Sequence, residues 1–148
     1  MQQPCACTCG ASKFAVDGKP IGRFLCHCSI CQSLYKQPYA DVTVFWAGSI
    51  KQTEPSDLVF KRYRLPPAVR RGTCPACGAP VLGYLRLAPF VQLGFVASRN
   101  FSDAAALPAP STHIFYHRRV ADVADALPKV SGYWPSEIAV IRLVLAGL

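Results

Sequence analysis

Charged residues are scarce in this chain. Asp, Glu, Lys and Arg together make up 16% of the sequence, whereas 51% of it is Ala, Val, Ile, Leu, Met, Phe, Trp, Tyr or Cys. This composition excludes intrinsic disorder, which needs low hydrophobicity and high net charge. Negative charge is especially scarce: the chain has 8 acidic and 16 basic residues, which gives a formal net charge of +8. A surplus of positive charge favours anionic partners such as nucleic acid, an acidic small molecule or a membrane surface.

Long hydrophobic runs are also absent. The longest apolar stretch, Ile138 to Leu148, contains Arg142 and is too short to span a bilayer. The first residues, Met1 to Cys5, lack the basic and apolar regions of a secretory signal. We therefore expect a cytoplasmic protein without membrane association. In that reducing compartment, clustered cysteines indicate metal binding or redox chemistry rather than structural disulfides.

The length of the chain and the distribution of its glycines and prolines predict one mostly β domain over residues 1–148. The sequence has no repeat and no linker, and its 13 prolines argue against a helical bundle. Ile30 to Tyr35 fits about one helical turn. Short runs with β-like patterns are separated by Gly and Pro. They are Phe14 to Asp17, Ile21 to Cys26, Asp41 to Trp46, Leu58 to Tyr63 before Pro66 and Pro67, Val81 to Leu87, Phe90 to Ala97, and Thr112 to Arg118.

The last segment predicts a short C-terminal helix over residues 136–148. Ser136 fits the N-cap and Glu137 the first turn. Apolar residues occur almost all round this helix, so we expect it to be buried on several sides. It could pack on the chain's own sheet or form a homo-oligomer interface, and the sequence leaves both open.

The main chemical signal is a set of eight cysteines in three groups. They are Cys5-Ala6-Cys7-Thr8-Cys9-Gly10, Cys26-His27-Cys28-Ser29-Ile30-Cys31 and Cys74-Pro75-Ala76-Cys77-Gly78. C-x-C and C-x-x-C spacings place two sulfurs about one metal at tetrahedral angles, as zinc requires. No single group supplies four ligands, so groups far apart in the sequence must meet in space.

Two distributions of these ligands are open. In one, Cys7, Cys9, Cys74 and Cys77 make a closed structural site, and Cys26, Cys28 and Cys31 make a site with a free coordination position, as catalytic zinc has. In the other, both sites are structural and His27 or His113 is the eighth ligand. A redox role for Cys74-Pro75-Ala76-Cys77 is disfavoured, because the strand and helix pattern that it requires is absent.

A site with three cysteines has a distinctive chemistry. Three thiolates and a divalent metal leave a charge of −1, which makes the metal a poor activator of water. Such a site suits a thiol as fourth ligand, and coordination deprotonates that thiol from its ordinary pKa of roughly 8.5. The resulting thiolate can attack an electrophilic carbon.

The order of the three cysteine groups resembles the glutathione-dependent formaldehyde-activating enzyme family, also called the centromere protein V family. The matching motifs are Cys7-x-Cys9-Gly10, Cys26-His27-Cys28-x-x-Cys31 and Cys74-x-x-Cys77-Gly78, supported by Phe14 to Val16, Arg71, Pro110 to Ile114, and Leu127-Pro128. The resemblance covers about residues 5–128, which we take as the core of the domain. The chain departs from the family pattern at Thr73, where an aromatic residue is usual, and at Lys36, where glycine is common.

The resemblance implies a β-tent fold of antiparallel sheets with zinc knuckles between them. It implies two zinc ions per chain, a structural one on Cys7, Cys9, Cys74 and Cys77, and a catalytic one on Cys26, Cys28 and Cys31. The implied reaction is a carbon–sulfur lyase reaction, which joins glutathione and formaldehyde reversibly into S-(hydroxymethyl)glutathione. We expect the catalytic site to be the more exposed of the two.

Several other residues are candidates for lesser roles. We expect Cys5 to be a spare thiol near a mobile terminus, and His27 to point away from the metal of its neighbours. His113 matches a family histidine and is a candidate for substrate binding, although a structural role competes. On a strand over residues 112–118, His113 would share a face with His117, which we expect to be structural.

The densest basic region has a functional and a structural interpretation. It contains Arg62, Arg64, Arg70 and Arg71, with Tyr63 among them. Arg71 leads the candidates for binding the carboxylates of glutathione, and a solvated face is the structural alternative. Tyr35, Tyr39 and Trp46 could line a pocket, but core packing is the more common role of such residues.

The predicted function is that of a zinc-dependent enzyme that resembles S-(hydroxymethyl)glutathione synthase, with the substrate thiolate on the zinc of Cys26, Cys28 and Cys31. One alternative is a zinc-binding interaction module without turnover. Another is a basic protein that binds nucleic acid or chromatin. This last is disfavoured because seven zinc-bound thiolates would lower the positive charge and no nucleic-acid-binding motif occurs.

Overall fold

The structure is a computed structural model, which describes residues 2–52, 58–65 and 68–147. The strands are β1 (Gln2–Ala6), β2 (Lys13–Asp17), β3 (Gly22–Cys26), β4 (Ala40–Trp46), β5 (Ile50–Gln52), β6 (Val59–Arg62), β7 (Arg70–Thr73), β8 (Pro80–Ala88), β9 (Val91–Ala97) and β10 (His113–Ile114). The α-helices are α1 (Ser29–Tyr35) and α2 (Tyr133–Ala146), and short 3₁₀ turns connect several of these elements.

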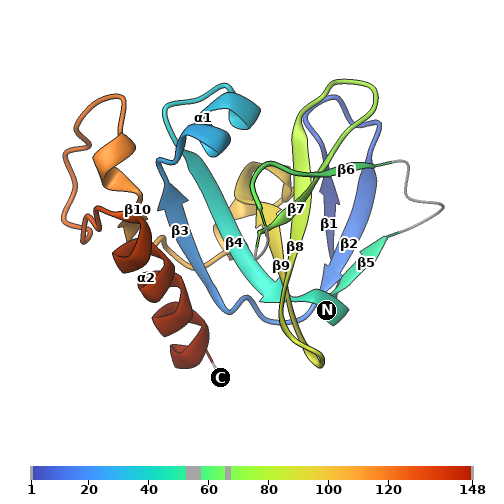
Figure 1. Cartoon of the computed structure of the whole chain (residues 1–148). Coiled ribbons are helices and arrows are strands. Elements are labelled where there is room, and N and C mark those ends of the chain that lie inside the picture. Colours follow the sequence, from blue (N-terminus) through green and yellow to red (C-terminus); the bar gives the residue numbers. More distant parts are fainter. Residues whose placement is uncertain (1, 53–57, 66–67, 148) are drawn as a thin grey trace.

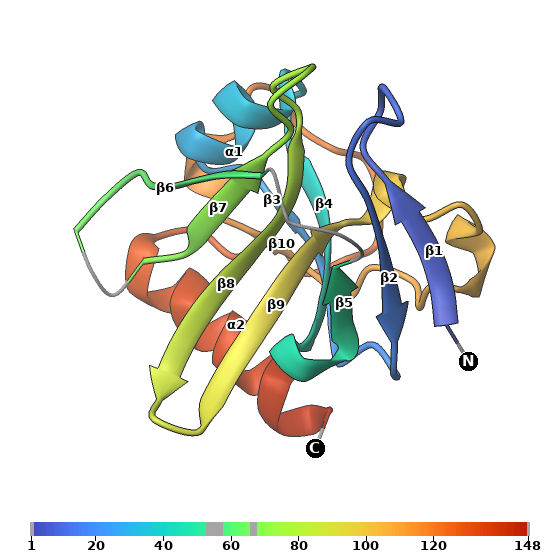
Figure 2. The ribbon, with the colours of Figure 1, turned by 90° about the vertical axis from the view of Figure 1, so that its right-hand side faces the viewer.

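Within the described residues the strands form two sheets. Strands β1, β2 and β5 make a three-stranded sheet, and the others make a larger sheet in the order β10-β3-β4-β9-β8-β7-β6. Helix α2 lies along one side of the larger sheet, and the three-stranded sheet lies on the other (Figures 1 and 2). The prediction of a mostly β fold with a C-terminal helix is confirmed. One pair differs from the expected antiparallel pairing of the others, because β10 pairs with β3 in parallel.

Most of the predicted strands form, but the run over residues 112–118 does not. Only His113 and Ile114 are extended, because Phe115 adopts a left-handed backbone with φ 53° and a 3₁₀ turn, Tyr116–Arg118, follows. His113 and His117 therefore do not share a strand face, which corrects that expectation. The predicted run over residues 58–63 becomes β6, while Pro66 and Pro67 lie outside the described residues.

Two hydrophobic clusters form the core, one on each side of the larger sheet. The first lies between the sheets and includes Phe14, Phe45 and Phe101. The second lies between the larger sheet and the helices and includes Phe24 and Tyr35. The cysteine groups divide between these two layers, since Cys7 and Cys74 belong to the first cluster and Cys26 and Cys31 to the second.

Helix α2 begins three residues earlier than its sequence predicts. Gly132, with φ 97°, occupies the N-cap, and Pro135 lies in the first turn, where a missing N–H costs little. Ser136 does not cap the helix, because its buried hydroxyl accepts a hydrogen bond of 2.8 Å from the backbone N–H of Phe115. Leu148, the last residue of the predicted helix, lies outside the described residues.

The helix is buried on one side only, which corrects the expectation of burial on several sides. Val144 is buried, and Leu143 packs so close to β3 that a Cβ at Gly22 would lie 2.4 Å from its Cδ2. By contrast, Ile138, Ile141 and Leu145 are exposed. Whether a second copy covers them stays a prediction. No helix among the described residues is long and apolar enough to cross a membrane.

Candidate metal centres

The first candidate centre joins two segments that are far apart in the sequence. The sulfurs of Cys7, Cys9, Cys74 and Cys77, the four-cysteine cluster, all lie within 4.8 Å of one another. Cys7 follows β1, whereas Cys74 follows β7, so the cluster connects the three-stranded sheet to the larger one. Gly10 and Gly78 follow the two cysteine pairs with φ of 80° and 73°, a left-handed conformation that favours glycine.

Backbone groups of the four-cysteine cluster stabilise negative sulfur. The Ser12 N–H donates to Cys7 Sγ at 3.3 Å. Burial raises the pKa of Cys7, but hydrogen bonds from this N–H and from the thiols of Cys9 and Cys74 outweigh it and lower the pKa to about 6. The Ala79 N–H lowers the pKa of Cys77 in the same way. Four neighbouring cysteines, some of which ionise readily, fit a metal that binds four thiolates in a tetrahedron, such as zinc.

The second candidate centre is local in sequence. The sulfurs of Cys26, Cys28 and Cys31, the three-cysteine cluster, also lie within 4.8 Å of one another, and no fourth Cys, His, Asp or Glu of the described residues joins them. Cys26 ends β3, Cys28 caps α1, and Cys31 lies in that helix. The Cys31 N–H donates to Cys28 Sγ at 3.3 Å. Hydrogen bonds from the thiols of Cys26 and Cys31 hold the pKa of Cys28 well below its ordinary value.

Arg71, on β7, lies beside the three-cysteine cluster. Its Nη1 is 3.7 Å from Cys31 Sγ. Burial lowers the pKa of Arg71, but negative charge on Cys31 and its neighbours outweighs this and raises it, so the guanidinium stays positive. Three thiolates and one divalent ion would carry a formal charge of −1, which one arginine balances. The donor set and its counter-charge therefore fit a bound metal ion.

The relative exposure of the two clusters is the reverse of what we expect from the sequence. Cys26 and Cys31 are buried and Cys28 is half-buried, whereas Cys9 and Cys77 of the four-cysteine cluster are exposed. The three-cysteine cluster is reached through a pocket of about 340 Å³ between the larger sheet and α2, which Arg71 and Tyr35 also line. A metal held by these three cysteines would therefore be reached from this pocket.

The predicted basic region divides between two sides of the sheet. Arg64 and Arg71 line the pocket of the three-cysteine cluster. Arg62 and Arg70 instead line a second hollow of about 320 Å³, together with Arg86. This separation follows from the alternation of side chains along β7, where Arg70 and Arg71 are adjacent and point to opposite faces.

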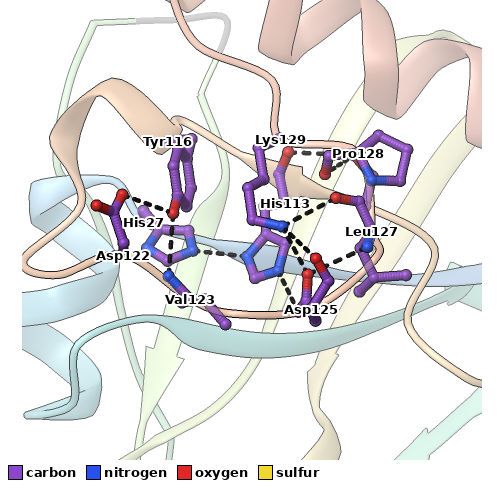
Figure 3. Close-up of polar contacts among 10 residues, drawn as sticks. His27, His113, Tyr116, Asp122, Val123, Asp125, Leu127, Pro128 and Lys129 are labelled. Atoms are coloured by element: carbon purple, nitrogen blue, oxygen red, sulfur yellow. Dashed lines mark hydrogen bonds and ion pairs between the residues drawn. The ribbon is translucent and has the colours of Figure 1, made fainter.

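His27 and His113 belong to a buried chain of hydrogen bonds rather than to a metal cluster (Figure 3). His27 Nε2 lies 2.8 Å from His113 Nδ1, and His113 Nε2 lies 2.8 Å from a carboxylate oxygen of Asp125. Lys129 also donates to Asp125, and these two contacts lower the pKa of Asp125 to about 2. With Asp125 ionised, His113 Nε2–H donates to it, and the second hydrogen bond joins His113 Nδ1 to His27 Nε2.

His113 is held inside this chain of hydrogen bonds. His113 is fully buried, both of its ring nitrogens have partners, and it is not among the residues that line the pocket. The substrate contact expected of His113 therefore stays a prediction, and its buried contacts favour the competing structural role. His117 is structural too, since its Nδ1 accepts a hydrogen bond from the Gly132 N–H at the start of α2.

Cys5 is not a spare thiol on a loose terminus. It lies in β1 opposite Phe14 and belongs to the core between the sheets, with 4% of its surface exposed. Burial raises its pKa to about 12, so it stays a neutral thiol. The sequence could not show this, because Pro4 makes β1 look unlike a strand, although proline is tolerated at a sheet edge.

The sequence does not predict that residues of α2 line the pocket of the three-cysteine cluster. Glu137, Tyr133 and Trp134 of α2 line the pocket, although more than 50 residues separate them from Arg71 on the facing strand. Arg64 donates to Glu137 at 3.3 Å and lies over the ring of Tyr133. Among the three predicted aromatic candidates only Tyr35 lines this pocket, whereas Tyr39 packs on His27 and Trp46 on the second hydrophobic cluster.

Comparison with known proteins finds one family model that matches this chain. The model of the family named GFA, glutathione-dependent formaldehyde-activating enzyme, matches residues 3–118. No curated protein matches the chain. The matched range contains both cysteine clusters and Arg71, and it ends before α2 begins at Tyr133.

Proposed function

Because the chain belongs to the glutathione-dependent formaldehyde-activating enzyme family, we propose that it is a zinc-dependent carbon–sulfur lyase that acts on thiol–aldehyde adducts. The observation that carries this proposal is the three-cysteine cluster, whose sulfurs lie within 4.8 Å of one another beside a pocket. Three thiolate ligands without a fourth are the donor set of a metal that takes a substrate atom. Bound zinc would supply a Lewis acid whose fourth position takes the substrate sulfur as a thiolate.

The reaction forms or breaks one carbon–sulfur bond. In the forward direction the thiolate sulfur attacks the aldehyde carbon, the carbonyl π electrons move to oxygen, and that oxygen takes a proton from water. In reverse, the hydroxyl of the adduct loses its proton, the carbonyl re-forms, and the sulfur leaves as a thiolate. Arg71 balances the negative charge of the cluster, and the apolar pocket walls limit the water around the reacting atoms.

We assign the four-cysteine cluster a structural zinc. Cys7, Cys9, Cys74 and Cys77 fill all four positions of a tetrahedral ion and leave none for a substrate. The whole protein would then bind two zinc ions with different roles. The seven cysteine ligands must stay reduced to bind metal, which favours a reducing compartment such as the cytoplasm.

The proposal is tested by the rate at which zinc-loaded protein forms S-(hydroxymethyl)glutathione from glutathione and ¹³C-formaldehyde, followed by NMR. We expect catalysis above the uncatalysed rate, loss of it in Cys28→Ser, and retention of it in the matched control Cys5→Ala, which removes a cysteine outside both clusters. Two bound zinc ions without thiol binding or turnover would instead favour an interaction module. Salt-dependent retention on DNA without thiol binding would favour the nucleic-acid alternative.

A further inference from the structure

The pocket beside the three-cysteine cluster has walls that suit an apolar ligand. Of the groups that line it, most are hydrocarbon side chains from the larger sheet and from α2. Its volume of about 340 Å³ has room for about ten non-hydrogen atoms, at about 30 Å³ for each water-sized group. The apolar groups include Phe24, Leu85 and Phe95 from the sheet and Trp134, Val140 and Ile141 from the helix.

We propose, on the basis of the function proposed above, that the substrate is an adduct whose thiol or aldehyde part carries an aromatic or aliphatic group that fills this pocket. Its sulfur lies at the three-cysteine cluster, and its apolar group extends between the larger sheet and α2. Glutathione, a peptide with charged carboxylate and ammonium groups, is a poorer fit to these walls, because buried polar groups need partners.

The charged side chains of the pocket already have partners, which supports an apolar occupant. Arg71 is next to Cys31 at 3.7 Å, and Arg64 pairs with Glu137 at 3.3 Å and lies over the ring of Tyr133. A peptide carboxylate would have to displace one of these partners. A hydrocarbon group requires no such exchange and gains free energy by leaving water.

Apolar surface at this pocket is also unusually exposed. Trp134 is 71% exposed, and Leu87 and Ile141 are about half exposed, although all three line the cavity. Exposed apolar groups that line a cavity are one feature of ligand-binding grooves. A bound ring or alkyl chain would cover these groups while its sulfur reached the cysteines.

The apolar helix wall is a feature of this chain beyond the family match. The family model ends at residue 118, whereas α2 starts at Tyr133. The cysteines and the sheet side of the pocket lie within the matched range, whereas the helix side of the pocket lies beyond it. A change of substrate class can therefore accompany an unchanged metal centre.

The test compares probes on the zinc-loaded full chain by calorimetry and by tryptophan fluorescence. The probes are phenylmethanethiol, glutathione and phenylmethanol, the last of which has the ring without the thiol. The variant Ile141→Asn places an amide in the pocket wall. Its matched control is Ile138→Asn on the same helix, because Ile138 is 45% exposed and Ile141 49%, but only Ile141 lines the pocket.

We expect phenylmethanethiol to bind at least tenfold more tightly than glutathione. Ile141→Asn should weaken that binding about five- to tenfold, and Ile138→Asn should leave it unchanged. If glutathione binds as tightly as phenylmethanethiol, and Ile141→Asn does not change its affinity, the proposed substrate class is overturned. The lyase proposal then still stands. If phenylmethanethiol binds no better than phenylmethanol, the thiol is not captured and the lyase proposal fails. In that case, weaker binding of both probes by Ile141→Asn would still support an apolar site. If no probe binds, the proposed pocket ligand is overturned.

Discussion

The sulfur of Cys9 lies 3.8 Å from the sulfur of Cys74, although 65 residues separate them in the chain. A metal bound there would connect the hairpin of β1 and β2 to the turn between β7 and β8. The three-cysteine cluster closes only the short segment from Cys26 to Cys31. Because the stabilising effect of a cross-link grows with the length of chain that it closes, the two centres should differ in their effect on folding.

The first prediction concerns this difference. Cys74→Ser removes a ligand from the cross-link between the sheets, and we expect it to lower the free energy of unfolding of the zinc-loaded protein by on the order of 3 kcal/mol. Cys28→Ser changes a half-buried residue of the local cluster and should lower it much less. Thermal unfolding and zinc content measure both effects, and each variant should retain one zinc ion. Equal destabilisation by the two variants would make both centres structural and remove the basis of the lyase proposal.

The second prediction concerns the thiol of Cys5. Because Cys5 is 4% exposed in the core between the sheets, an alkylating reagent should not modify it in the folded protein, with or without metal. Cys9 and Cys77 are exposed and should become reactive once a chelator removes the metal. Peptide mass spectrometry after brief labelling distinguishes these sites. Labelling of Cys5 as fast as Cys77 in the folded, metal-free chain would mean that β1 detaches.

Much of the fold follows from local sequence patterns. β4 carries Val42, Val44 and Phe45, and such β-branched and aromatic residues favour a strand whatever surrounds it. Strands β1, β5 and β7 are missed because their residues are extended through pairing with neighbours. β7, for example, reads Arg70 to Thr73, a polar stretch with a glycine, yet it pairs on both sides with β6 and β8. The β-tent arrangement implied by the family resemblance stays a prediction.

The cysteine spacing could suggest the two clusters because each pair of ligands is local. The surroundings of the clusters could not be predicted in this way. Asp125 reaches His113 only because the loop after β10 folds back, and Trp134 reaches the pocket only because α2 packs on the larger sheet. Contacts of this kind depend on tertiary packing and leave no periodic signal in the sequence. The same reason explains why Cys5 looks peripheral in the sequence but is buried in the fold.

The third prediction concerns Lys36, which ends helix α1 in a left-handed conformation with φ 52° and ψ 42°. A side chain with a Cβ is strained there, and glycine is not. We expect Lys36→Gly to raise the free energy of unfolding by roughly 0.5–1 kcal/mol. Lys36→Ala is the matched control, because it removes the charge and keeps the Cβ. An equal gain from both variants in thermal unfolding would assign the effect to the charge instead of the backbone.

The fourth prediction concerns the buried chain of His27, His113 and Asp125. His113→Leu leaves the His27 ring without its hydrogen-bond partner, and we expect it to destabilise the protein by about 1–3 kcal/mol. Combined with Asp125→Asn in a double-mutant cycle, it should give a coupling different from zero, because the two residues form one network.

The control for this cycle is Asp122→Asn. Asp122 lies in the same loop and reaches His113 only through the Tyr116 ring, so its coupling to His113→Leu should be smaller than that of Asp125. Denaturant unfolding of the single and double variants gives both couplings. A coupling of zero between His113 and Asp125 would mean that the hydrogen bond between them does not contribute to stability.

The fifth prediction concerns the charge balance at the three-cysteine cluster. Arg71 lies 3.7 Å from Cys31, and a unit charge at that distance interacts with a thiolate by about 4 kcal/mol at an effective dielectric constant of about 20. Part of this is offset by the cost of burying the guanidinium, so we expect Arg71→Met to weaken zinc binding there by about tenfold or more. Arg70→Met is the matched control, because Arg70 is the adjacent residue on β7 and faces the other hollow. Competition with a chelator measures both zinc ions of each variant, and the four-cysteine cluster serves as an internal reference. Equal weakening by Arg70→Met and Arg71→Met would mean that the overall positive charge of the chain, and not the placement of Arg71, stabilises the metal.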